Sequence, residues 1–124
     1  MIYSGGCHCG AVRFEAEAEA EAEEKVTCQE CNCSICSKSG YLHLIVPNSK
    51  FKLLQGSNQL STFTFDTGEA KHLFCKTCGI KSFYIPRSNP NGFSVNLRCL
   101  DSQPKEVNIE LFDGKNWEQN AHQL

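Results

Sequence analysis

Short apolar runs separated by turn-forming residues dominate the chain and predict strands. Residues 41–46 are apolar, β-branched and aromatic, and Pro47 ends the run, which is typical of a central strand. Residues 93–97 and 107–111 alternate apolar and polar positions, as half-buried strands do. No stretch has the periodicity of an amphipathic helix, so we predict an all-β fold. Further short strands are expected at 11–14, 51–54, 60–65, 71–74 and 81–85.

An alternating Glu/Ala segment at residues 15–24 interrupts this pattern. As a helix it would be polar all round, and as a strand it would offer one face of alanine, so neither form buries much. We therefore expect a solvated loop or strand extension, and an acidic patch that recruits a partner is the alternative. The whole chain, residues 1–124, is predicted to form one domain, because a single core is normal at this length.

The charge balance changes once this acidic segment is set aside. The net charge is -2, but six of the fourteen acidic residues lie in the segment, and elsewhere twelve basic residues face eight acidic ones. This mild positive charge suits binding of an anionic small molecule, but it is smaller than the positive charge expected of a nucleic-acid-binding protein. The chain also shows no membrane-length apolar run and no secretory signal. We expect no nucleic-acid or membrane partner and a reducing, cytoplasmic compartment.

Nine cysteines indicate metal chemistry. Cys7 and Cys9 form one short-gap pair and Cys75 and Cys78 another, and a glycine follows each pair. Four sulfurs from two such knuckles are the closed ligand set of a structural zinc. Disulfides are the rival explanation, but an odd number of thiols, their tight spacing and the missing secretory signal disfavour them. We predict a structural zinc that joins the N-terminal loop to the second knuckle.

The second cysteine group, Cys31, Cys33 and Cys36, has the spacing C-x-C-x2-C and no obvious fourth ligand downstream. Three protein ligands and an open position define a catalytic zinc. Cys28 is a possible fourth ligand that would make the site closed and structural, whereas an iron–sulfur cluster lacks a recognised spacing here. Three thiolates make zinc a weak Lewis acid, so a thiol substrate that attacks a carbon electrophile fits better than hydrolysis.

Other polar residues are weaker candidates. Arg87 lies in a proline-bounded loop and could clamp a substrate carboxylate, although a plain turn residue explains it as well. Ser37 and Lys38 follow the second cysteine group and could offset its negative charge. Cys99 is expected to be a small buried hydrophobe. None of the four histidines stands at a gap that the cysteine ligands leave unfilled: His8, His43, His72 and His122.

Three motifs together resemble the glutathione-dependent formaldehyde-activating enzyme family, in the family's order and over nearly the whole chain. They are Cys7-His8-Cys9-Gly10, Cys31-Asn32-Cys33-Ser34-Ile35-Cys36 with Gly40, and Phe74-Cys75-Lys76-Thr77-Cys78-Gly79. Residues 75–79, 86–90 and 99–101 look closest to its centromere protein V branch. The resemblance implies an Mss4-like, zinc-stapled fold of short antiparallel strands. It also implies two zinc ions per chain, a structural one on Cys7, Cys9, Cys75 and Cys78 and a catalytic one on Cys31, Cys33 and Cys36.

The same resemblance implies an activity and its partners. Glutathione would add reversibly to formaldehyde, or a related small aldehyde, to give S-(hydroxymethyl)glutathione, a reaction of the carbon–sulfur lyase class. The alternative is a non-enzymatic zinc-binding interaction module of the centromere protein V type, whose second zinc is structural. A fourth ligand from Cys28 would favour that alternative. The acidic segment at 15–24 and Cys28 itself are departures from the family pattern.

Overall fold

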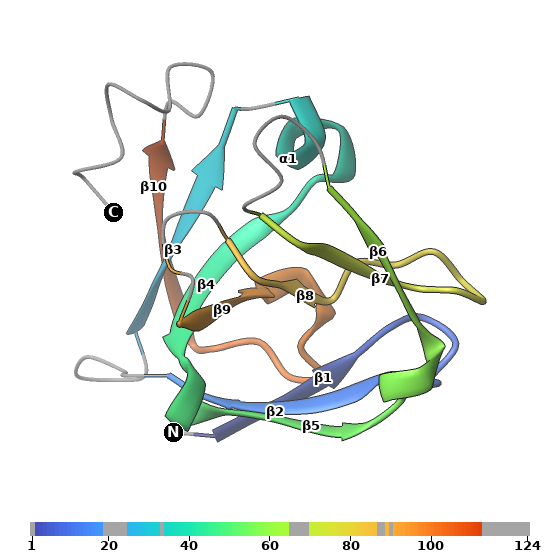
Figure 1. The fold of residues 1–124 in the computed structure, drawn as a ribbon. Coiled ribbons are helices and arrows are strands. Elements are labelled where there is room, and N and C mark those ends of the chain that lie inside the picture. Colours follow the sequence, from blue (N-terminus) through green and yellow to red (C-terminus); the bar gives the residue numbers. More distant parts are fainter. Residues whose placement is uncertain are drawn as a thin grey trace.

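Ten strands and one short α-helix make up the described part of the chain, residues 2–18, 25–32, 34–64, 70–86, 89 and 91–112, in a computed structural model (Figure 1). The predicted all-β class is confirmed. The elements are β1 (Ile2–Gly6), β2 (Arg13–Glu17), β3 (Lys25–Cys31), α1 (Ser34–Ser39), β4 (Leu42–Pro47), β5 (Phe51–Gln55), β6 (Leu60–Phe63), β7 (His72–Cys75), β8 (Phe83–Tyr84), β9 (Gly92–Asn96) and β10 (Glu106–Phe112).

The strands form three sheets. A five-stranded sheet has the order β10-β3-β4-β9-β8, a three-stranded sheet has the order β1-β2-β5, and β6 pairs with β7. All pairs are antiparallel except β10 with β3, which run parallel. The predicted central strand, β4, indeed lies in the middle of the largest sheet.

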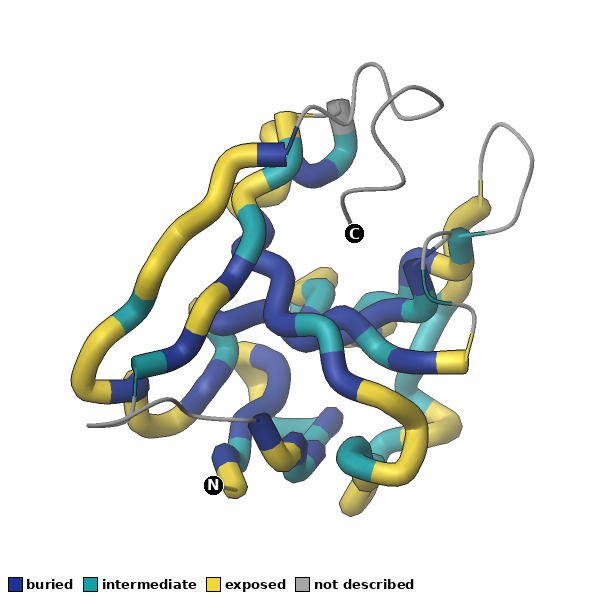
Figure 2. The backbone as a smooth tube through the Cα atoms, turned by 90° about the vertical axis from the view of Figure 1, so that its left-hand side faces the viewer, coloured by how far each residue is buried: buried dark blue, intermediate teal, exposed yellow. Residues whose placement is uncertain are grey.

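The hydrophobic core combines the inner faces of the two larger sheets, as the buried segments in Figure 2 illustrate. Alternation along β4 turns Leu44 and Val46 into this core and His43 to the opposite face. Phe14 on β2 is fully buried, and its ring lies 5.7 Å from that of Phe51 and 6.1 Å from that of Phe83. The His43 face of the five-stranded sheet is therefore the one left for polar chemistry.

The start of the acidic segment is a strand extension rather than a loop. Glu15 and Glu17 belong to β2, and the alanines between and after them, Ala16 and Ala18, are 0% and 3% exposed. The alanine face is thus packed in the core, because a small side chain fits where the two sheets approach. Residues 19–24 lie outside the described residues.

Two strands escaped the sequence prediction. β1 was not among the expected strands, and it contains Gly5, where a Cβ would lie 2.5 Å from the carbonyl oxygen of Cys99. Glycine is needed at this position for close strand packing and not for a turn. β3 carries Cys31, a predicted ligand of the second site, and Cys28, its possible fourth ligand. Because the cysteine spacing was interpreted as a metal site, the strand at this position was not predicted.

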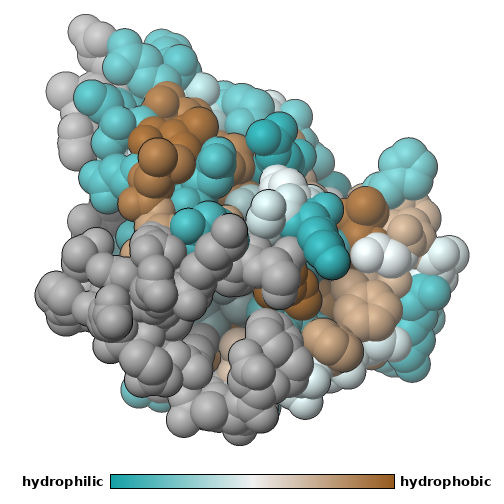
Figure 3. Space-filling model, turned by 90° about the horizontal axis from the view of Figure 1, so that it is seen from above, coloured by the Kyte–Doolittle hydropathy of each residue, from teal (hydrophilic) through white to brown (hydrophobic). Residues whose placement is uncertain are grey.

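Two further elements differ from expectation in their details. No helix was predicted, but the structure forms α1, which is too short to show helical periodicity in the sequence. β10 forms where a half-buried strand was predicted, but it is a mostly exposed edge strand, and Ile109 and Leu111 on it are 48% and 82% exposed. Figure 3 shows apolar surface on the upper side in groups bordered by hydrophilic side chains.

None of the helices in the described ranges has the length and apolar character needed to cross a membrane.

Candidate metal centre and active site

Four cysteine sulfur atoms form a cluster between the N-terminal loop and the turn after β7. The Sγ atoms of Cys7, Cys9, Cys75 and Cys78 all lie within 4.8 Å of one another. The Sγ of Cys9 is 3.7 Å from that of Cys7 and 3.7 Å from that of Cys75. A tetrahedral zinc with Zn–S bonds of about 2.3 Å separates its sulfurs by about 3.8 Å. The predicted structural ligands are therefore brought together with spacing that fits zinc.

Backbone geometry shapes both knuckles of this cluster. The Val12 N–H points at the Cys7 sulfur at 3.4 Å, and the Thr77 N–H points at the Cys75 sulfur at 3.4 Å. Such amide groups stabilise thiolate charge. Gly79 closes the second knuckle with a φ of 77° and donates its N–H to the Cys75 carbonyl at 2.9 Å. A residue with a Cβ is strained at that φ, which explains the glycine after the cysteine pair.

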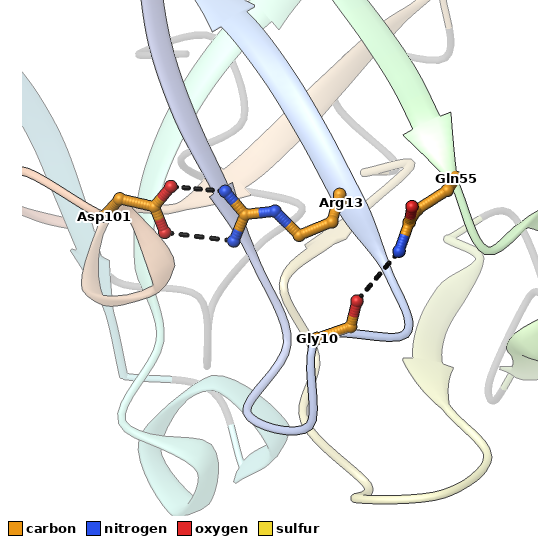
Figure 4. Close-up of polar contacts among 4 residues, drawn as sticks. All are labelled: Gly10, Arg13, Gln55 and Asp101. Carbon is orange, nitrogen blue, oxygen red and sulfur yellow. Dashed lines mark hydrogen bonds and ion pairs between the residues drawn. The ribbon is translucent and has the colours of Figure 1, made fainter.

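Polar contacts hold the first knuckle against the sheets (Figure 4). The Gln55 side chain, at the end of β5, donates from Nε2 to the Gly10 carbonyl at 3.0 Å. The Arg13 guanidinium binds both carboxylate oxygens of Asp101, which joins β2 to the segment after β9. Hydrogen bonding from Arg13 lowers the pKa of Asp101. The loop that carries Cys7 and Cys9 is thus positioned from two sides.

The thiols of the cluster carry unequal charge. Burial opposes ionisation of Cys78, but N–H groups of Cys9 and Ile80 and the neighbouring sulfurs outweigh it and lower the pKa of Cys78 to about 6. The Ala11 N–H favours the Cys9 thiolate, but desolvation and the three adjacent sulfurs together raise the pKa of Cys9 to about 11. A divalent cation would stabilise all four thiolates together, so the donor set itself suits zinc.

The second cysteine group lies on β3, in the five-stranded sheet, and on α1. Gln29 on β3 pairs with His43 on β4, and strand alternation places Cys31 on the same face as both. Cys36 on α1 is buried, and its Sγ lies 3.2 Å from the Nε2 of His43. Cys33 is outside the described residues. Among the residues that the structure does describe, no group of three potential metal ligands comes together here. The structure thus directs Cys31 and Cys36 to one face and leaves the full predicted set untested.

Cys28 points away from this group. It is 1% exposed and belongs to the hydrophobic core, on the face of β3 opposite Cys31. Burial raises the pKa of its thiol, which disfavours the thiolate that a metal needs. The geometry therefore disfavours Cys28 as a fourth ligand of the second site. The eight described cysteines are thiols and not disulfide halves.

His43 is the residue that sequence analysis undervalued. Its Nδ1 lies 2.8 Å from the Ser94 hydroxyl and 3.2 Å from the Tyr84 hydroxyl. Its ring packs against Tyr41 at 4.6 Å and Tyr84 at 5.5 Å between centroids. The available signal was a lone titratable residue in the most apolar strand of the chain, where burial requires a partner. Its partners lie up to 51 positions away, so the sequence could not name them.

Lys81 and His72 extend this polar network beyond Tyr84. The Lys81 Nζ lies 2.6 Å from the His72 Nδ1, 3.8 Å from the centroid of the Tyr84 ring and 4.8 Å from that of Tyr41. The His72 ring stacks on Tyr84 at 4.8 Å. A cation over an aromatic ring is held by the negative face of that ring. Lys81 gave no signal in the sequence because a lone lysine is ordinarily a surface residue.

The remaining candidate residues are exposed, half-buried or outside the described residues. Ser37 and Lys38 are exposed on α1, and His8 is exposed beside the first cluster. Cys99 is half-buried, and burial raises its pKa to about 11, in keeping with a packing role. Arg87 and His122 lie outside the described residues.

Comparison with known proteins then decides the family. A profile described as "Glutathione-dependent formaldehyde-activating enzyme" matches residues 2–115. The chain belongs to this family. A relative from Halomonas elongata, described as a "Putative glutathione-dependent formaldehyde-activating enzyme", is 24% identical over 129 aligned positions, which cover 94% of this chain and 80% of the relative. Membership of an enzyme family, together with this relative, supports an enzymatic role.

A solved structure shares the family's fold with this chain. It is a crystal structure of a Rhodobacter sphaeroides protein that is 33% identical, with a TM-score of 0.72. The match covers 86% of this chain and 99% of that one. The β architecture seen here is therefore shared with an experimentally determined structure.

Proposed function

We propose that this chain is a zinc-dependent carbon–sulfur lyase of the S-(hydroxymethyl)glutathione synthase type. It joins glutathione to formaldehyde or a related small aldehyde. The observation that carries the proposal is the family match across residues 2–115. The placement of Cys31 and Cys36 on one polar sheet face supports it.

Two zinc ions per chain have different roles in this proposal. Cys7, Cys9, Cys75 and Cys78 hold the structural ion, and the four-sulfur geometry suits a closed site. Cys31, Cys33 and Cys36 hold the catalytic ion. Held by these residues, zinc would supply the Lewis acidity that favours the thiolate form of a substrate thiol. A reducing compartment such as the cytoplasm keeps these cysteines available for metal.

In the reaction, the glutathione sulfur forms a bond to the aldehyde carbon and the carbonyl π bond breaks. The proton lost by the thiol ends on the carbonyl oxygen, which becomes the hydroxyl of the new hydroxymethyl group, so no oxidant or reductant is needed. Cys31 and Cys36, on the sheet face that carries His43, would hold the ion beside which this sulfur reacts. Tyr41 and Tyr84 flank His43, and Cys36 beside it is 4% exposed, so little water reaches this sulfur.

The interaction-module alternative has no support from the position of Cys28. That alternative would be favoured by a fourth protein sulfur at the second site, but Cys28 lies in the core on the other face of β3. With three cysteine ligands, the second site keeps a position open for a substrate sulfur.

Exchange NMR tests the activity, because glutathione and formaldehyde also combine without an enzyme. We expect the zinc-loaded protein to accelerate exchange between free formaldehyde and the glutathione adduct, and S-methylglutathione to give no adduct. Cys36→Ser should abolish the acceleration and lower the zinc content by about one ion per chain. Cys28→Ala is the matched control and should retain both zinc and activity. Acceleration that survives in Cys36→Ser, or zinc loss in Cys28→Ala, would contradict the proposal.

A further inference from the structure

His43 is held in one orientation by groups from three strands. β4 carries the ring, Ser94 on β9 and Tyr84 on β8 meet its Nδ1, and Tyr41 packs on its side. The Tyr41 hydroxyl donates to the Ser94 carbonyl and so fixes the neighbouring backbone. His43 is 6% exposed, so its ring nitrogens depend on these protein partners.

The two hydroxyls beside Nδ1 allow the tautomer in which Nδ1 accepts a hydrogen bond and Nε2 carries the proton. Both groups that approach Nδ1 are hydroxyls, and each can donate a proton to a ring nitrogen. Lys81 lies over the face of Tyr84, and its positive charge makes the phenolic hydroxyl a better donor. Nδ1 then acts as the acceptor, and a neutral imidazole in this state carries its proton on Nε2. That Nε2–H faces the Cys36 sulfur at 3.2 Å.

We propose that His43 is a positioning residue for the second metal site, which donates its Nε2–H to the Cys36 thiolate while Ser94 and Tyr84 hold Nδ1. This inference rests on the proposed function, because Cys36 is a ligand only if the second site binds metal. The hydrogen bond fixes the direction of the sulfur and withdraws charge from it. A sulfur that donates less charge would leave a metal ion at this site a stronger Lewis acid, which would favour binding of a substrate thiolate beside three protein thiolates.

The alternative geometry, in which His43 itself ligates the metal, makes a different prediction. A sulfur and a nitrogen bound to one tetrahedral zinc lie about 3.5 Å apart, from bond lengths of about 2.3 and 2.0 Å. The observed 3.2 Å is shorter and suits a hydrogen bond to sulfur. Ligation by His43 would also close the site against a substrate thiol. The two arrangements are separable by spectroscopy.

Cobalt substitution tests the proposal in the full-length protein. His43→Phe keeps a ring between Tyr41 and Tyr84 but removes the donor, and His43→Gln offers an amide N–H near the position of Nε2. His72→Phe is the matched control, because His72 is also buried and stacked on Tyr84, and its Nδ1 lies 2.6 Å from the Lys81 Nζ. Metal affinity at each site is measured by competition with a chromophoric chelator, and the sulfur-to-cobalt charge-transfer bands are recorded in parallel.

We expect His43→Phe to weaken the second site by about 10- to 100-fold and to leave the first site unchanged. Its charge-transfer band should move to longer wavelength, because loss of the hydrogen bond raises the energy of the sulfur electrons. His43→Gln should restore most of both properties, and His72→Phe should resemble the wild type.

Three outcomes would overturn the inference, and they are distinguishable. An unchanged second-site affinity and band in His43→Phe would show that the hydrogen bond has no role, while two bound metals would leave the proposed function standing. Nitrogen scattering in the X-ray absorption of the second site, lost in His43→Phe, would show direct ligation instead. A wild-type protein that binds one metal per chain would overturn the catalytic site and, with it, the role of His43.

Discussion

Gly56 lies between the two cysteine knuckles, and an alanine there should destabilise the protein more than at any comparable turn. It adopts the left-handed region with a φ of 95°, and a Cβ would come within 2.4 Å of the Ala11 carbonyl oxygen and 2.8 Å of the Val12 Cα. Val12 is the residue whose N–H faces the Cys7 sulfur. Gly56→Ala therefore strains its own backbone and also pushes the backbone that positions a metal ligand.

The magnitude follows from these two effects. A Cβ in the left-handed region costs about 1–2 kcal/mol. Displacing packed backbone costs about 1–3 kcal/mol more. At about 2.1 cal/mol/K of unfolding entropy per residue, each kcal/mol lowers the melting temperature of a chain of this length by about 4 °C. Gly56→Ala should thus lower the melting temperature by about 8–20 °C.

Gly40→Ala is the matched control. Gly40 also has a positive φ, 67°, but a Cβ there meets nothing within 4 Å, so only the first cost applies. Its melting temperature should fall by about 4–8 °C, which is less than the fall expected for Gly56→Ala. Thermal unfolding is followed by circular dichroism with the same excess of zinc in each sample, because bound metal shifts the midpoint. Equal losses for the two variants would refute the close-contact reasoning.

Three other perturbations test the metal sites and the core. Cys78→Ser should unfold or aggregate the protein, whereas Cys36→Ser should lose about one zinc and keep its circular dichroism spectrum; equal loss of folding would remove the distinction between the sites. Because the Cys9 thiol has a pKa of about 11, zinc binding at pH 8 should release protons, and affinity should fall as pH drops through the Cys78 value of about 6. Calorimetry in buffers of different ionisation enthalpy measures both effects, and binding independent of pH would contradict them. Phe14→Ala, at a fully buried ring, should cost about 3–5 kcal/mol in urea unfolding, and a loss below 1 kcal/mol would show that the core assignment is wrong.

Local patterns in the sequence were enough to predict the strand-rich class and the four-sulfur cluster. The spacing of Cys7 with Cys9 and of Cys75 with Cys78 specifies two knuckles whatever the intervening chain does, because each gap is closed by a few backbone angles. Alternation of apolar and polar residues likewise predicts a strand from its immediate neighbours. Such signals depend only on residues a few positions apart, and they were sufficient for these features.

Tertiary structure alone decided which face each side chain occupies and which distant residues meet. Cys28 and Cys31 have metal-like spacing, but β3 turns them to opposite faces because strand alternation has a period of two. The parallel pairing of β10 with β3 has no local signal, since it is set by the packing of whole sheets. His43 on β4 meets Cys36 from α1 and Ser94 from β9 only after these three elements have assembled. Long-range contacts of this kind follow from burying apolar faces together, which no short window of sequence records.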